Sequence, residues 1–145
     1  MNNFTILLVE DNPADARLTE LALKDCKLVH ELHVASDGEE ALAFLNQEPP
    51  YANSPAVDLI LLDLNLPGMS GLEVLKTIRD SEKLKKIPVI ILTVSDSEQD
   101  ILRSYDLHVN GYITKPVGTK GFVEVIKQIE RFWFSVVKLP PRTDH

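Results

Sequence analysis

Residues 57–63, Val-Asp-Leu-Ile-Leu-Leu-Asp, form an almost uninterrupted apolar run that ends on a carboxylate. Similar runs occur at 5–9, 87–92 and 109–114, and a weaker one at 31–35. Continuous apolar runs of this length are typical of strands that are buried on both faces of a parallel sheet. The sequence therefore contains five candidate strands.

Segments with the apolar spacing of a helix separate these runs. Their starts are indicated by Asn12-Pro13, a capping residue followed by proline, and by capping-box patterns at 36–39, 70–73 and 95–98. Strands that alternate with helices in this way predict an α/β fold, a parallel sheet with helices on both faces. The apolar positions of the first four helices are Leu18, Leu21, Ala22 and Cys26; Ala41, Leu42 and Leu45; Leu72, Leu75 and Ile78; Ile101, Leu102 and Tyr105.

Length and composition limit the class of protein. A chain of 145 residues corresponds to one domain. No apolar run approaches the length of about 18 residues that a membrane-spanning helix needs, and the start of the chain lacks a secretory signal. The lone cysteine, Cys26, excludes an internal disulfide and is typical of a reducing cytosol, so we expect a cytoplasmic protein. A net charge of −7 argues against nucleic acid or a membrane surface as partner.

Polar residues stand where the predicted strands end: Glu10-Asp11, Asp63, Thr93 and Lys115. The carboxyl ends of parallel strands meet at one edge of the sheet, where ligands bind in such folds. Any one of these acids could simply cap a helix. Together they form an oxygen-only donor set suited to Mg²⁺, with a lysine and a hydroxyl beside it. Such a set suits phosphoryl transfer, in which a carboxylate can itself be the nucleophile.

The motifs at 8–12, 61–71, 91–93 and 111–116 resemble those of the receiver domain of two-component response regulators. The resemblance extends from about residue 5 to residue 134. It implies a flavodoxin-like, doubly wound sheet of five parallel strands in the order 2-1-3-4-5. It also implies a receiver domain over 1–138 with an extended last helix, and we expect a flexible tail over 139–145.

The resemblance implies a role for each acidic residue of the site. Asp63 matches the residue that accepts the phosphoryl group. Asp11 would bind Mg²⁺ directly, whereas Glu10 would act largely through water. The backbone carbonyl of Asn65 matches a further metal ligand.

The resemblance also assigns the residues that respond to phosphorylation. Thr93 matches the hydroxyl that moves toward the phosphoryl group, and Lys115 matches the lysine that pairs with a phosphoryl oxygen. Tyr112 matches the aromatic switch. The Lys115–Pro116 peptide bond matches one that is cis in such domains. Val94, which follows Thr93, is larger than the residue usual there and would narrow access to the site.

A narrower resemblance points to a partner. Residues 12–15, the proline-rich loop at 47–56 and residues 104–110 resemble the single-domain regulators that act with cyanobacterial phytochromes. This implies a sensor histidine kinase of the phytochrome type as phosphoryl donor. We therefore expect a stand-alone regulator, not an enzyme, that signals through a change of shape and protein contacts.

Two other classes of protein are alternatives to a phosphorylated receiver. An aspartate-nucleophile phosphohydrolase is the alternative function, but that chemistry usually has a second acid two residues after the nucleophile, where this chain has Asn65. A structural pseudo-receiver that is never phosphorylated is the third, and the complete acidic set argues against it.

The last helix carries more apolar surface than one sheet face requires. Its main stripe runs from Phe122 to Val137, whereas Val123 and Phe134 fall outside it at the helical period. Exposed apolar patches mark partner surfaces. We therefore predict a homodimer through the fourth helix, fifth strand and fifth helix, with Val123, Phe134, Val136 and Val137 in the interface.

Overall fold

The computed structural model describes residues 4–24 and 30–135, which form ten alternating strands and helices. The expected tail, the domain boundary at residue 138 and Cys26 lie outside these residues. The elements are β1 (Phe4–Val9), α1 (Pro13–Leu23), β2 (His30–Ala35), α2 (Gly38–Leu45), β3 (Leu59–Leu62), α3 (Gly71–Asp80), β4 (Val89–Thr93), α4 (Glu98–Asp106), β5 (Gly111–Thr114) and α5 (Thr119–Ser135).

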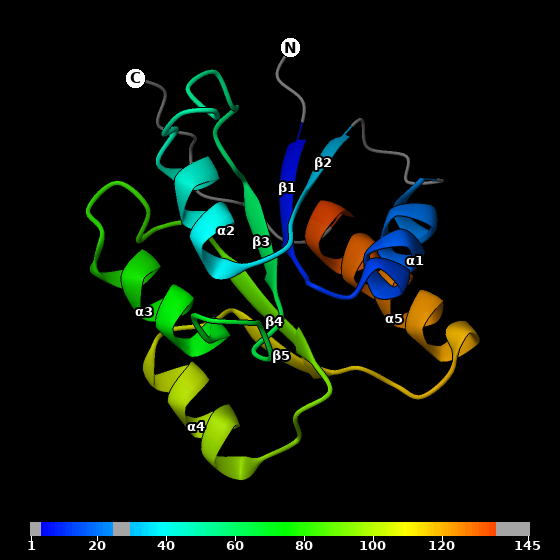
Figure 1. Ribbon diagram of the computed structural model, residues 1–145. Coiled ribbons are helices and arrows are strands. Elements are labelled where there is room, and N and C mark those ends of the chain that lie inside the picture. Colours follow the sequence, from blue (N-terminus) through cyan, green and yellow to red (C-terminus); the bar gives the residue numbers. More distant parts are fainter. Residues whose placement is uncertain (1–3, 25–29, 136–145) are drawn as a thin grey trace.

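The five strands are parallel and follow the order β2-β1-β3-β4-β5, which confirms the predicted fold. Figure 1 shows α1 and α5 on one face of the sheet and α2, α3 and α4 on the other. Alternate side chains of each strand point to opposite faces. On β1, Leu7 and Val9 join the apolar core on one side of the sheet, and Ile6 and Leu8 join the core on the other.

The strand register brings the polar residues to one edge. Val9 stands opposite Leu62, and Thr93 stands opposite Thr114. Backbone hydrogen bonds continue one residue beyond these pairs: Asp63 donates to the carbonyl of Val9 over 3.1 Å, and Lys115 donates to that of Thr93 over 2.7 Å. The backbone therefore places the residues that follow the strands side by side.

Two of the four predicted helix starts are confirmed. Asn12 caps α1, with its Oδ1 accepting hydrogen bonds from two backbone amides, and Pro13 is the first helical residue. Ser70 caps α3 and accepts from the amide of Glu73. Gly71 follows it because the start of α3 lies against the end of β3: a Cβ at Gly71 would stand 2.3 Å from the carbonyl oxygen of Asp63.

At the other two starts the prediction named the wrong residue. Asp37, not Ser36, caps α2, and Ser97, not Ser95, caps α4. At α2 a carboxylate oxygen accepts the capping hydrogen bond in place of a hydroxyl. The hydroxyl of Ser95 instead donates to Asp100 over 2.6 Å, so it is already engaged.

The outer helices differ from the apolar pattern. Leu102 and Tyr105 of α4 are 62% and 51% exposed, although their spacing predicted a buried face. On α5, Phe122, Ile126 and Ile129 are buried as predicted, but Phe132 is 53% exposed. Val123, expected outside the stripe, is half-buried and packs against the core. The side chain of Phe134 and residues Val136 and Val137 lie outside the described part of the structure.

The side chain of Arg79 connects α3 by hydrogen bonds to the loops that precede β4 and β5. Its guanidinium donates to the backbone carbonyls of Lys85, Ile87, Leu107 and His108 over 2.8–3.0 Å. One side chain therefore fixes both approaches to the strands that carry the residues of the site. Within the described part of the chain, every helix is too short or too polar to cross a bilayer.

Candidate functional site

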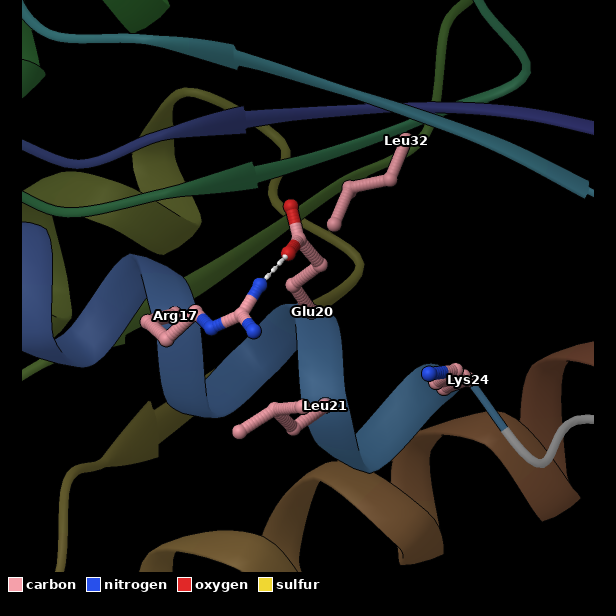
Figure 2. A pocket seen from close by; sticks show the side chains of 5 residues that line it. All are labelled: Arg17, Glu20, Leu21, Lys24 and Leu32. Carbon is pink, nitrogen blue, oxygen red and sulfur yellow. Dashed lines mark hydrogen bonds and ion pairs between the residues drawn. The ribbon is translucent and has the colours of Figure 1, made fainter.

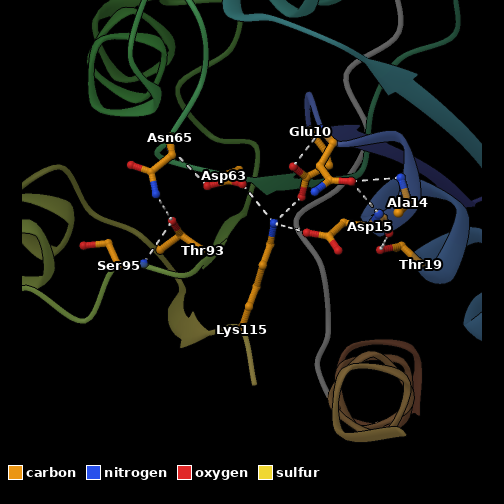
Figure 3. A network of polar contacts seen from close by, with 10 residues as sticks. Glu10, Ala14, Asp15, Thr19, Asp63, Asn65, Thr93, Ser95 and Lys115 are labelled. Atoms are coloured by element: carbon orange, nitrogen blue, oxygen red, sulfur yellow. Dashed lines mark hydrogen bonds and ion pairs between the residues drawn. The ribbon is translucent and has the colours of Figure 1, made fainter. Parts of the chain in front are cut away.

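The side chains that follow β1, β3 and β5 meet around the ammonium group of Lys115 (Figure 3). Lys115 Nζ donates to Asp63 Oδ2 over 2.9 Å, and it also donates to Glu10 Oε1. The side chains of Lys115, Glu10 and Asp63 are only 4%, 3% and 6% exposed. The structure thus brings together three of the residues that the sequence predicted, and it buries them.

A fourth residue of this cluster was missed by sequence reasoning. Asp15 lies in the first turn of α1, and its Oδ2 accepts from Lys115 Nζ over 2.9 Å. In the sequence, residues 12–15 indicate a helix start and a family resemblance, but no role for Asp15 in the site. The available signal was a carboxylate three residues after the helix cap Asn12, in the loop-to-helix segment that follows Glu10-Asp11.

Glu10, Asp11 and Asp63 form the predicted acidic cluster. Each offers a carboxylate oxygen within 4.8 Å of the others, and Asp11 is exposed whereas the other two are buried. Hard divalent cations such as Mg²⁺ prefer oxygen donors, so these residues fit a metal of that class. Asn65 is predicted to bind the metal through its backbone carbonyl. Its backbone N–H donates to Asp63 Oδ1 over 3.0 Å.

Thr93 and Tyr112 are linked through the loop after β4. Thr93 is fully buried, and its Oγ1 accepts long hydrogen bonds from the Ser95 amide over 3.4 Å and from Asn65 Nδ2 over 3.5 Å. The hydroxyl of Tyr112 donates to the carbonyl of Ser95 over 2.8 Å. Ser95, which the sequence did not single out as a site residue, therefore joins the two predicted switch residues. Their movement on phosphorylation stays a prediction.

Burial and the hydrogen bonds of Lys115 together set the charges of the cluster. Loss of hydration raises the pKa of the Glu10 carboxyl to about 7, against the opposing effect of Lys115. Burial alone would lower the pKa of the Lys115 ammonium, but its hydrogen bonds to Glu10, Asp63 and Asp15 outweigh that cost and raise it. Lys115 is therefore a permanent cation, whereas Glu10 titrates near neutral pH.

We expect Mg²⁺ affinity to depend on pH because the metal must displace the Glu10 proton. The folded protein holds this proton up to about pH 7, while the unfolded chain releases it near 4.5, so the metal-free protein loses stability as the pH rises between these values. Mg²⁺ should bind about five- to tenfold more weakly at about pH 6 than at about pH 8. Calorimetric titrations at the two pH values measure this ratio.

Glu10→Gln is the matched control for that titration because it removes the titrating group. The variant should bind Mg²⁺ more weakly and with little pH dependence. A wild-type affinity that is equal at both pH values would contradict the assignment.

One expectation from the family resemblance is wrong. Within 4–24 and 30–135, the only cis peptide bond is Pro49–Pro50, and Lys115–Pro116 is trans. Trans is the intrinsically favoured isomer of a bond before proline, by about 0.5–1 kcal/mol.

Two surface hollows lie along α1. The one in Figure 2 measures about 280 Å³, and its lining includes the exposed Arg17–Glu20 ion pair but none of the residues of the acidic cluster. A larger hollow of about 410 Å³ opens beside the acidic cluster and includes Glu10 and Asp11 in its lining. The second hollow therefore gives access to the site from solvent.

Comparisons with known proteins agree with this geometry. Residues 6–127 match the response regulator receiver domain family. The response regulator Rcp1 of Synechocystis sp. is 50% identical over 135 residues, 93% of this chain and 92% of Rcp1. The crystal structure of the phosphorylated cyanobacterial phytochrome response regulator RcpA is similar with a TM-score of 0.93 at 49% identity, and the match covers 97% of this chain and 100% of that one. The Mn²⁺-bound form of Rcp1 has a TM-score of 0.92 at 48% identity, covering 95% and 99% of the two chains. This protein belongs to the response regulator receiver domain family.

Proposed function

We propose that Asp63 accepts a phosphoryl group from a phosphohistidine of a sensor histidine kinase. The observation that carries the proposal is that the Asp63 carboxylate lies beside both Lys115 and the acidic donors Glu10 and Asp11. In the transfer, the phosphorus–nitrogen bond of the donor breaks and a bond from phosphorus to an Asp63 oxygen forms. The imidazole of the donor leaves with the bonding pair and takes up a proton.

The surrounding residues supply charge and position. Mg²⁺ held by Glu10, Asp11 and Asp63 would neutralise the oxygens of the transferring group, which is the main catalytic need of phosphoryl transfer. Lys115 adds a fixed positive charge. Phosphorylation adds about −1.5 to −2 charge units, which Thr93 can meet with its hydroxyl, and Tyr112 is coupled to that movement through Ser95.

A phytochrome-type kinase is the donor that the relatives favour. RcpA is described as a cyanobacterial phytochrome response regulator, and the two chains match over nearly their full lengths. The test is phosphotransfer from a panel of purified, phosphorylated sensor kinases, phytochrome kinases included. Fast transfer of one phosphoryl group from a phytochrome kinase supports the proposal. Transfer from none of the kinases would overturn it, and repeated turnover of small phosphate esters would favour the phosphohydrolase alternative.

We also propose a homodimer through α4, β5 and α5. Leu102, Tyr105 and Val117 are exposed apolar residues on and beside these elements, and a two-fold axis would bury one such surface against its own copy. Phe134→Lys, in the predicted interface, should shift a micromolar sample toward monomer in light scattering. A wild type that is monomeric at high concentration, phosphorylated or not, would rule the dimer out.

A further inference from the structure

Every proton of the Lys115 ammonium is already engaged. An ammonium group has three N–H donors, and Lys115 Nζ donates to the carboxylates of Glu10, Asp15 and Asp63 (Figure 3). A phosphoryl oxygen on Asp63 can therefore gain a hydrogen bond from this lysine only if one of the three carboxylates gives one up. The identity of that carboxylate sets how readily the lysine becomes available.

Asp15 is the partner that is easiest to release. Its side chain is 25% exposed, compared with 3% for Glu10 and 6% for Asp63. Water can solvate a partly exposed carboxylate that gives up its hydrogen bond from Lys115, whereas a buried acceptor that gives it up has no water to replace it. Asp15 also lies outside the set of carboxylates that can share a metal ion, so its release leaves that set intact.

Asp15 opposes an anion at the site through its own charge as well. The Asp15 and Asp63 oxygens are both bonded to the same nitrogen, so they lie within about 6 Å of each other, a distance at which like charges disfavour each other. The same carboxylate favours a cation beside Glu10 and Asp63 through its negative charge. Its effects on anion and cation binding therefore have opposite signs.

We propose that Asp15 is a positioning residue that competes with the phosphoryl group for Lys115, and so limits how strongly phosphorylated Asp63 is stabilised. The inference rests on the proposed function of Asp63. In the unphosphorylated protein Asp15 accepts the third hydrogen bond from Lys115. On phosphorylation Lys115 donates that hydrogen bond to a phosphoryl oxygen instead, and the Asp15 carboxylate turns to solvent.

The test compares Asp15→Asn with wild type in two titrations. The first uses beryllofluoride, an analogue of the phosphoryl group, at saturating Mg²⁺, followed by fluorine NMR. The second uses Mg²⁺ alone, followed by calorimetry. Loss of a unit charge at this distance should make beryllofluoride bind about three- to tenfold more tightly and Mg²⁺ about three- to tenfold more weakly.

The opposite signs separate this role from a structural one. If Asp15 only stabilised the start of α1, its loss would weaken both ligands or neither, and either result would overturn the proposal. Asp15→Ser provides a second neutral variant in case the asparagine protein does not fold, and Asp15→Glu should restore wild-type binding of both ligands.

Glu20→Gln is the matched control. Glu20 lies on the same helix, lines the hollow beside the site and pairs with Arg17, but it makes no hydrogen bond to Lys115. Both affinities should stay close to wild type in this variant, and equal shifts in Glu20→Gln and Asp15→Asn would overturn the proposal by showing a general charge effect. Wild-type protein that does not bind beryllofluoride would instead contradict the proposed function of Asp63.

Discussion

Asp63→Asn is expected to abolish phosphorylation while the protein stays folded. An amide nitrogen or amide oxygen is too poor a nucleophile to replace the carboxylate, which would form the acyl phosphate. The variant keeps one of the two side-chain oxygens that accept hydrogen bonds from Lys115 and from the Asn65 amide. It also removes a negative charge that disfavours ionised Glu10, so the metal-free fold should not lose much stability.

Intact-protein mass spectrometry after incubation with acetyl phosphate and Mg²⁺, or with a phosphorylated kinase, measures this directly. Asp80→Asn is the matched control, because Asp80 is an exposed residue of α3 whose carboxylate pairs with Lys76 on the surface. The control should gain one phosphoryl group as the wild type does. A normal phosphorylated mass in Asp63→Asn would show that another residue is the acceptor.

Lys115→Met is expected to lower the free energy of unfolding by about 3–5 kcal/mol in metal-free buffer near neutral pH, because it leaves buried carboxylates without their cation. Two of the three partners, Glu10 and Asp63, have almost no access to water. The loss should shrink as the pH falls, since protonated carboxyls no longer repel each other. It should also shrink in saturating Mg²⁺, which binds the folded cluster and restores positive charge.

Urea unfolding with and without Mg²⁺ measures both effects. Lys76→Met is the control: the Lys76–Asp80 pair on α3 is about two-thirds exposed on both sides, and such pairs contribute little. A Lys115→Met protein as stable as wild type in metal-free buffer would show that the cluster does not need the lysine's charge.

The sequence alone determined the order of strands and helices along the chain and most of the polar residues that meet at the site. Both depend on short-range patterns. A buried parallel strand appears in the sequence as a continuous apolar run. The residue that follows the strand lies at the carboxyl edge of the sheet. Glu10, Asp63, Thr93 and Lys115 could therefore be assigned to one edge although they are far apart along the chain.

The exposure of the outer helices could not be read in the same way. The apolar spacing on α4 correctly marked a helix, but Leu102 and Tyr105 face solvent and Ser104 is the buried residue. Periodicity shows that a helix has an apolar face, and it does not show how far that face turns toward the sheet. That angle results from packing against neighbouring elements.

Asp15 is the clearest case of a residue whose role only the tertiary structure decided. By sequence it is a carboxylate in the first turn of a helix, where many acids are found because the helix dipole favours them. Its partner, Lys115, is 100 positions away. α1 packs beside α5 on one face of the sheet (Figure 1), and in this arrangement Asp15 in the first turn of α1 accepts from Lys115, which follows β5. Sequence patterns determined which residues leave the strands at the site, whereas the docking of α1 on the sheet decided which further carboxylate shares the lysine.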